Sequence, residues 1–240
     1  NSNIPMFRNE IACENVIRLA NGFPIITFYG YVTDGIFQNW EEVNSHAFQS
    51  TETSPGDIRF KDLNNDGKIN EDDRTVIGNP SPKWIFSMNN NLSYKGFDLS
   101  IYLQGVSGND IFNANNITNE GMAGAANQTT AVLNRWTGEG TSYVMPRAVL
   151  NDPAKNNRVS DRWVEDGSYL RIKNITLGYN FPKKWIKKLT LENARLFVSC
   201  DNVATITGYS GFDPEVDING IDNNRYPISR TLSLGVNFNF

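Results

Sequence analysis

The last ten residues show the clearest alternation of apolar and polar side chains in the chain. Every second residue is apolar, and the residues between them are Thr, Ser, Gly or Asn. The apolar set is Leu232, Leu234, Val236, Phe238 and Phe240. Because successive side chains of a β-strand point to opposite faces, the pattern predicts a strand near 230–240 with one apolar face. A strand of a soluble sandwich alternates too, but one that ends in Phe at the last residue is typical of an outer-membrane barrel.

Similar alternation recurs along the chain and predicts an all-β fold. Further strands are expected near 84–95, 97–105, 168–181 and 194–204, and a less regular, aromatic-rich strand near 22–33. Six strands of about ten residues have the ~9–11 residues that cross a bilayer. Aromatic residues lie at the strand ends, as at membrane interfaces. We therefore expect part of a transmembrane antiparallel β-barrel.

The connections between these strands alternate between short and long. The turn at Lys95-Gly96 and the stretch 182–193 are short, whereas 34–83, 106–167 and 205–229 are long, polar and rich in Asn, Gly and Asp. Barrels place short turns on the periplasmic side and long loops outside. The three long connections are thus expected to be extracellular loops.

Composition excludes several classes of function. Net charge is −4, from 22 basic and 26 acidic residues, so nucleic acid is not expected as a partner. One histidine, His46, and two cysteines, Cys13 and Cys200, exclude multi-histidine and CxxC metal sites. Mean hydropathy is −0.43, and ~18 consecutive apolar residues occur nowhere. The chain begins without Met, which we interpret as a processed chain or a fragment.

One segment has the spacing of a twelve-residue calcium loop. The expected ligands are Asp62, Asn64, Asp66, the backbone carbonyl of Lys68, Asn70 and Asp73. Gly67 permits the sharp turn, while Asp73 stands where Glu is usual. Such an oxygen set suits Ca2+ as a structural cofactor. A metal-free turn rich in Asx residues is the alternative.

Several segments together resemble the SusC/RagA family of TonB-dependent outer-membrane transporters. Their order and spacing match the C-terminal part of that family across nearly the whole chain. The matching segments are Tyr29–Phe37, Pro55–Asn70, Ile77–Trp84, Asn157–Tyr179, Gly211–Glu215 and the terminal strand.

The resemblance implies a location, a function and partners. The family's barrel is similar to 22-stranded, plugged transporters, of which six strands are about a quarter. It implies import of oligosaccharides or peptides across the outer membrane of a Gram-negative bacterium, with no enzymatic step. The implied partners are the remainder of the same barrel, outer-membrane lipid, a SusD-like surface lipoprotein, and the TonB complex through an N-terminal region outside this chain.

Residues of the loops and of the terminal strand are candidates for further roles. Trp40, Trp136, Tyr143 and Trp163 could stack on a substrate, although such rings more often pack a loop against its neighbours. Phe238 and Phe240 are the expected assembly signal. A secreted, calcium-stabilised carbohydrate-binding β-domain remains an alternative. A glycoside hydrolase would need two positioned carboxylates, and the sequence singles out none.

Overall fold

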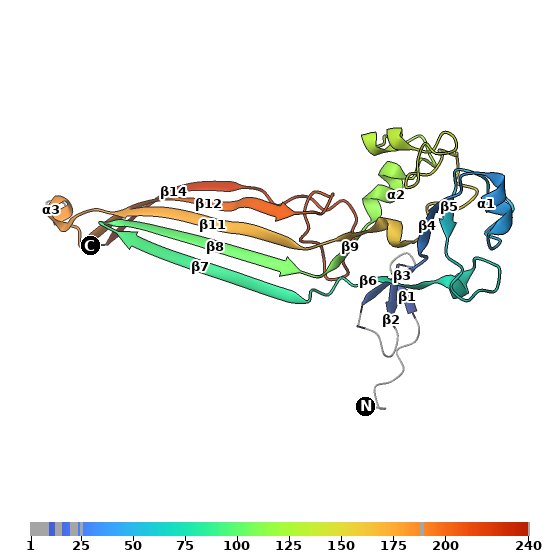
Figure 1. The fold of residues 1–240 in the computed structure, drawn as a ribbon. Coiled ribbons are helices and arrows are strands. Elements are labelled where there is room, and N and C mark those ends of the chain that lie inside the picture. Colours follow the sequence, from blue (N-terminus) through green and yellow to red (C-terminus); the bar gives the residue numbers. More distant parts are fainter. Residues whose placement is uncertain (1–9, 13–15, 20–23, 25, 188–189, 240) are drawn as a thin grey trace, which may run out of the picture. The chain divides into compact units, whose positions relative to one another are not determined.

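The computed structural model describes residues 10–12, 16–19, 24, 26–187 and 190–239 (Figure 1). It divides into two compact units, which are described separately. The loop unit comprises residues 1–81, 110–165 and 216–225, and the sheet unit comprises residues 82–109, 166–215 and 226–240. Within the described ranges, none of the helices has the length and apolar character needed to span a membrane.

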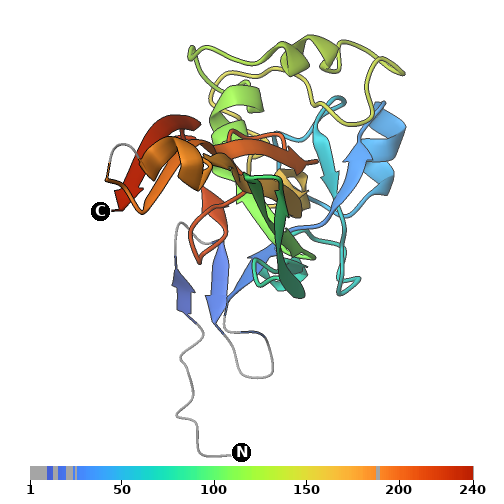
Figure 2. The ribbon, with the colours of Figure 1, turned by 90° about the vertical axis from the view of Figure 1, so that its left-hand side faces the viewer.

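The sheet unit contains one antiparallel sheet of five long strands in the order β14-β12-β11-β8-β7 (Figure 1). The strands are β7 (Trp84–Tyr94), β8 (Phe97–Ser107), β11 (Tyr169–Asn180), β12 (Asn193–Thr207) and β14 (Thr231–Asn239). They lie at five of the six places where the sequence predicts strands. A one-turn helix, α3 (Lys183–Ile186), joins β11 to β12 and is nearest the reader in Figure 2, which looks along the strands.

The register aligns the apolar side chains of all five strands on one face of this sheet. Leu177 of β11 pairs with Leu99 of β8 and Val198 of β12, and Val198 pairs in turn with Leu234 of β14. Leu99 is half-buried, and Leu177, Val198 and Leu234 are exposed, Leu234 to 75%. Polar residues such as Ser199 alternate with them. The sheet therefore has one polar face and one apolar face, which Asn90 of β7 interrupts.

Gly178 makes room for an ion pair that crosses the central strand of the polar face. Asp98 of β8 and Arg195 of β12 lie on either side of it, with 3.0 Å from the Arg195 Nε to the Asp98 Oδ1. A Cβ at position 178 would lie 2.6 Å from atoms of both side chains. A larger residue here would thus separate the pair.

The loop unit is built from short strands and helices. Its four-stranded sheet, in the order β1-β2-β3-β6, comprises β1 (Glu10–Ala12), β2 (Ile17–Leu19), β3 (Thr27–Gly30) and β6 (Thr75–Gly78). A second sheet pairs β4 (Thr33–Ile36) with β5 (Ile58–Phe60), and a third is ordered β10-β9-β13, from β9 (Asp110–Asn113), β10 (Val164–Asp166) and β13 (Ile221–Asp222). The helices are α1 (Trp40–Ser45), α2 (Ala114–Glu120), η1 (Glu71–Asp73), η2 (Thr130–Asn134) and η3 (Asp161–Trp163).

Two apolar clusters form the core of the loop unit. One contains Val16, Phe28, Phe112 and Trp163, and the other contains Tyr31, Ile58, Phe60 and Ile69. Parts of the three long polar connections thus fold together around a core instead of forming separate open loops.

The prediction of a long membrane strand near 22–33 is wrong. The structure has a strand of only four residues there, Thr27–Gly30, and it lies in the loop unit. The adjacent residues Thr27 and Phe28 are both buried, whereas a membrane strand exposes alternate residues. Residues 22, 23 and 25 of the predicted strand lie outside the described part of the chain.

Candidate functional site

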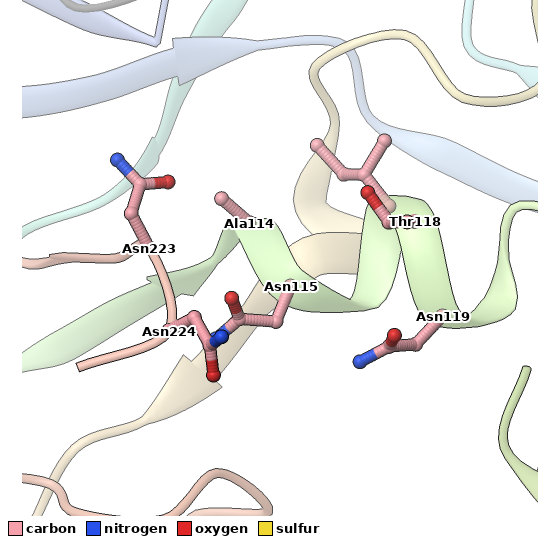
Figure 3. A pocket seen from close by; sticks show the side chains of 7 residues that line it. Ala114, Asn115, Thr118, Asn119, Asn223 and Asn224 are labelled. Atoms are coloured by element: carbon pink, nitrogen blue, oxygen red, sulfur yellow. The ribbon is translucent and has the colours of Figure 1, made fainter. Parts of the chain in front are cut away.

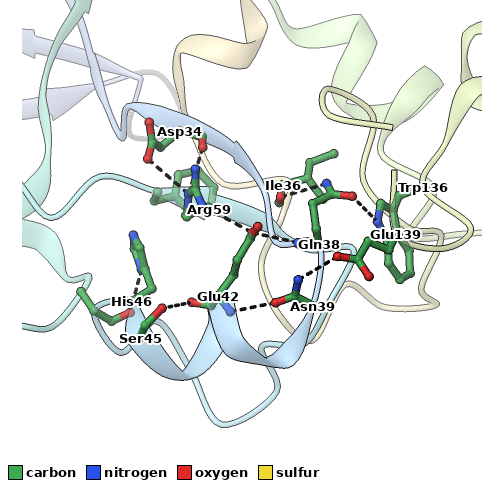
Figure 4. Close-up of polar contacts among 12 residues, drawn as sticks. Asp34, Ile36, Gln38, Asn39, Glu42, Ser45, His46, Arg59, Trp136 and Glu139 are labelled. Carbon is green, nitrogen blue, oxygen red and sulfur yellow. Dashed lines mark hydrogen bonds and ion pairs between the residues drawn. The ribbon is translucent and has the colours of Figure 1, made fainter. Parts of the chain in front are cut away.

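Gln38 connects the end of β4 to the segment that contains Trp136 (Figure 4). Its side-chain nitrogen donates to the carbonyl oxygens of Ile36 (3.1 Å) and Ser142 (3.0 Å). Its oxygen accepts from the Trp136 Nε1 (3.2 Å) and from the backbone N–H of Gly140 (2.9 Å). Both ends of the amide are therefore satisfied, and the indole of Trp136 serves to hold two loop segments together.

Asp57 makes a second connection between distant loop segments, through a fully buried carboxylate. Arg147 approaches it in a bidentate geometry, at 2.8 and 3.0 Å, and the Asn156 side chain donates at 2.9 Å. The backbone N–H of Ser54 donates the fourth hydrogen bond, at 2.9 Å. A buried carboxylate is tolerated only when it is paired and hydrogen-bonded in this way.

The other predicted substrate-contacting aromatics lie in different surroundings. The side chains of Trp40 and Tyr143 are exposed, to 59% and 65%. Trp163 is only 1% exposed, because it packs in a core cluster and donates its Nε1 to the carbonyl oxygen of Arg158 (3.3 Å). Its ring therefore cannot stack on a substrate in this structure.

Several arginines of the loop unit lie over aromatic rings, among them Arg158 and Arg162. The guanidinium carbon of Arg158 is 4.4 Å from the ring centroid of Phe60, and that of Arg162 is 4.2 Å from the ring centroid of Trp163. Burial lowers the pKa of Arg158 and lowers that of Arg162 to about 10. Both guanidinium groups pack against rings and donate to backbone carbonyl oxygens, Arg158 to that of Ala154 at 3.2 Å and Arg162 to that of Glu120 at 3.4 Å.

The first half of the predicted cation loop curls around its own side-chain oxygens. The backbone N–H groups of Asp66 and Gly67 donate to the Asp62 carboxylate at 3.3 and 2.9 Å. Asn64 accepts from the Asp66 N–H at 3.0 Å, and Asp66 accepts from the Lys68 N–H at 2.8 Å. This last bond, together with the amide of Asn64, lowers the pKa of the Asp66 carboxyl.

The second half of the loop is closed by Asp73. This buried residue accepts from the backbone N–H groups of Leu63 and Asn70, both at 2.8 Å, and the Asn70 side chain in turn caps η1. In the described residues, no group of three or more His, Cys, Asp or Glu is placed to hold a metal ion. The loop is thus closed by hydrogen bonds, and a cation would have to use the remaining lone pairs of these oxygens.

A cavity of about 490 Å³ lies between α2 and the segment that follows β13 (Figure 3). Its lining is neutral and consists of Ala114, Asn115, Ile117, Thr118, Asn119, Asn223 and Asn224. Within the described chain, the side chains of these four asparagines make no hydrogen bond. The sequence did not point to this cavity, because it depends on the pairing of β13 with β9, 109 residues apart in the register Ile221↔Phe112.

Two neighbouring asparagines, Asn113 at the end of β9 and Asn116 of α2, are hydrogen-bonded instead of facing the cavity. Asn113 and Asn116 donate to the Glu165 carboxylate at 2.9 and 3.3 Å, whereas Asn115 and Asn119 face the cavity. Asn224 has a φ of +64°, a backbone conformation that Asn tolerates better than most residues. Free amides can donate and accept hydrogen bonds, so the cavity suits a neutral polar group.

The polar face of the sheet carries a second ionic cluster, around Arg171. This side chain is only 2% exposed and lies 2.5 Å from Asp213 and 2.6 Å from Glu215. Lys173 lies 3.4 Å from the same Glu215. The cluster fixes the Gly211–Glu215 segment, whose motif is one of those that carry the family resemblance, against β11.

The assembly candidates lie at the end of β14. Phe238 is 54% exposed on the apolar face, opposite Ala194 in the register. Phe240 lies outside the described residues.

Comparison with curated proteins finds similarity to TonB-dependent receptors. Over 92% of its length the chain is 36% identical to TonB-dependent receptor P3 of Formosa agariphila, of which it covers 23%. Over 78% of its length it is 30% identical to TonB-dependent receptor SusC of Bacteroides thetaiotaomicron, of which it covers 18%. The chain thus spans less than a quarter of either curated relative. No protein-family model matches it.

The fold is similar to that of a solved transporter. The open-open state of the RagAB peptide importer matches 94% of this chain, and 23% of its own matched chain, with a TM-score of 0.73 and 22% sequence identity. This likeness identifies the sheet unit as part of a transmembrane β-barrel.

Proposed function

Because the chain belongs to the SusC/RagA family of TonB-dependent receptors, we propose that it forms part of a transporter that imports oligosaccharides or peptides across the outer membrane of a Gram-negative bacterium. Uptake is driven through TonB, which engages an N-terminal region outside this chain. A SusD-like lipoprotein covers the outer mouth. Import needs no covalent chemistry, so the residues of this chain bind and enclose the nutrient.

The observation that carries this proposal is the in-register apolar face of the long sheet. Its apolar side chains are exposed to solvent in the isolated chain, which would be unfavourable unless another apolar phase covers them. In the described residues, β7 pairs only with β8 and β14 only with β12. Open edges in hydrocarbon cost several kcal/mol per unpaired group, so the remainder of the barrel is a necessary partner.

The loop unit supplies contacts for the nutrient in this proposal. The cavity lined by Asn115, Asn119, Asn223 and Asn224 offers unpaired amides, and Trp40 and Tyr143 offer exposed rings. Amide groups can hydrogen-bond to hydroxyls and to peptide groups, which fits either class of nutrient. The loop 62–73 binds Ca2+ as a structural ion that holds the loop closed.

Uptake by intact cells tests this proposal. Cells with the complete transporter should accumulate a fluorescent oligosaccharide or peptide that exceeds the size limit of porins, and deletion of tonB should abolish the accumulation. Uptake that persists without TonB would contradict the proposal. The double substitution Asn115→Leu with Asn119→Leu should reduce uptake, whereas Asn134→Leu, at an exposed asparagine outside the cavity, should not. An unaffected double variant would exclude the cavity but leave the import function standing.

The orientation of the chain can be tested separately. In a variant with Cys13 and Cys200 replaced by Ser, a cysteine at Ile218, which is 86% exposed in the loop unit, should react with an impermeant reagent on whole cells. A cysteine at Lys95, in the short turn, should react only after lysis. The opposite result would invert the proposed topology.

A further inference from the structure

The connection between β11 and β12 carries a cluster of lysines beside a cavity of about 1020 Å³. Lys183, Lys184 and Lys187 line this cavity, and Glu192 is the one acid among its lining residues. Within the described residues, none of these three lysines forms an ion pair. Their ammonium groups therefore give this end of the sheet unit a positive charge that its own side chains do not balance.

A chain of aromatic rings connects these lysines to the apolar face of the sheet. Ring centroids are 4.6 Å apart for Phe97 and Tyr179, 5.4 Å for Tyr179 and Phe181, and 6.4 Å for Phe181 and Trp185. Trp185 is 64% exposed on α3, next to the buried Ile186. Aromatic residues of membrane proteins gather where acyl chains meet headgroups.

The turn between β7 and β8 lies at the same end of the sheet. Phe97 pairs with Tyr179, and the backbone N–H of Asn180 donates to the Gly96 carbonyl oxygen at 2.7 Å. Lys95, in this turn, has its ammonium nitrogen 5.1 Å from the Tyr94 ring centroid. A fourth lysine thus lies on an aromatic ring at the same boundary. Lysine side chains reach from such a boundary with their stems on apolar surface and their charges in the headgroup layer.

We propose that Lys183, Lys184 and Lys187 bind the phosphate of an anionic phospholipid whose acyl chains cover the adjacent aromatic rings. Charge complementarity favours a headgroup with net negative charge, because a zwitterionic headgroup brings a cation of its own to a site that already holds three. The proposed orientation makes this the periplasmic leaflet. The binding site itself does not depend on that assignment, nor on which nutrient is imported.

Lipid retention by the complete transporter tests this proposal. The protein is reconstituted in nanodiscs of phosphatidylcholine with one fifth phosphatidylglycerol, released into mild detergent, and examined by native mass spectrometry. The wild type should retain phosphatidylglycerol in preference to phosphatidylcholine. The triple variant Lys183→Gln, Lys184→Gln and Lys187→Gln should lose that preference, by about fivefold for each lysine at low ionic strength. A heat-modifiability gel confirms that each variant is folded.

Two matched variants make the result decisive. Replacing the same three lysines by Arg should preserve retention, because the charge is kept. Replacing Lys61 and Lys155 of the loop unit by Gln should also preserve it, because these lysines do not line the cavity. Equal retention of phosphatidylglycerol by the wild type and the Gln triple variant would overturn the proposal. So would equal retention of the two lipids by the wild type, or occupation of the site by an acidic periplasmic protein instead.

Discussion

Replacing Leu232 by Arg should destabilise the assembled barrel strongly, because Leu232 lies near the middle of the apolar face. The register places it in one row across all five strands. Leu232 pairs with Cys200, Cys200 with Ile175, Ile175 with Ile101, and Ile101 with Asn90. Because the strands are tilted, residues of one row lie at different depths, and the depth of Leu232 must be measured along its own strand, β14.

The aromatic ends of β7 set the scale. Trp84 and Tyr94 bound this strand, and at ~3.4 Å per residue and a tilt of ~40° the distance between them spans ~26 Å of membrane thickness. Along β14, Leu232 is six residues from Phe238 and hence ~16 Å in depth from that aromatic end, close to the midplane at ~13 Å. Arginine on the lipid face costs about 2–4 kcal/mol at the midplane and about 0–1 kcal/mol near the interface. The larger cost corresponds to roughly a 30-fold to 700-fold change in the folding equilibrium.

The measurement is urea unfolding of the complete transporter in lipid vesicles, followed by tryptophan fluorescence. Ser233→Arg is the matched control, because Ser233 is adjacent on the same strand but pairs with Ser199 on the polar face. Its change in unfolding free energy should stay below about 1 kcal/mol, as for substitutions on a lumen face. Equal destabilisation by both substitutions, or a larger effect at Ser233, would refute the assignment of the apolar face to lipid.

Three further outcomes are expected. Calcium at millimolar concentration should slow proteolysis of the 62–73 loop, and Asp62→Asn with Asp66→Asn should remove that protection; cleavage at the same rate with and without calcium would count against the site. Asp57→Ala should cost about 1–3 kcal/mol in the thermal unfolding of the loop unit, because the buried Asn156 amide loses its acceptor and Arg147, whose side chain is 27% exposed, loses its counter-charge. A change below about 0.5 kcal/mol would show that these contacts are not needed. Phe238→Ala combined with deletion of Phe240 should reduce the amount of transporter in the outer membrane, as measured by immunoblot of membrane fractions, and unchanged levels would remove both residues as an assembly signal.

The sequence predicts the long sheet well because the pattern that specifies each strand lies within that strand. Each long strand alternates apolar and polar residues, and the two-residue turn at Lys95-Gly96 fixes the register of β7 against β8. Side chains such as Leu99 and Leu234 face the apolar side for that reason alone. Alternation does not depend on residues far away in the chain.

The fold of the loop unit cannot be predicted in this way, because it depends on contacts between residues far apart in the sequence. Asp57 and Arg147 are 90 positions apart, and no pattern in the residues around either of them predicts that they form an ion pair. Trp163 follows a charged stretch that suggests exposure, yet contacts with Phe28 and Phe112 bury it. Cooperation between segments, and not the character of each segment, determines which of these side chains are buried.

The long connection between β8 and β11 has a consequence for the kinetics of folding. Tyr169 pairs with Val106 across 63 positions, whereas β7 and β8 meet across a two-residue turn. Closing the longer connection as a flexible chain costs about 3 kcal/mol more in loop entropy than closing the turn. Residues 110–165 of this connection fold within the loop unit, which shortens the flexible part that must still be closed. Early folding of the loop unit should therefore accelerate the pairing of β8 with β11, and substitutions that weaken its cores should slow the assembly of the long sheet.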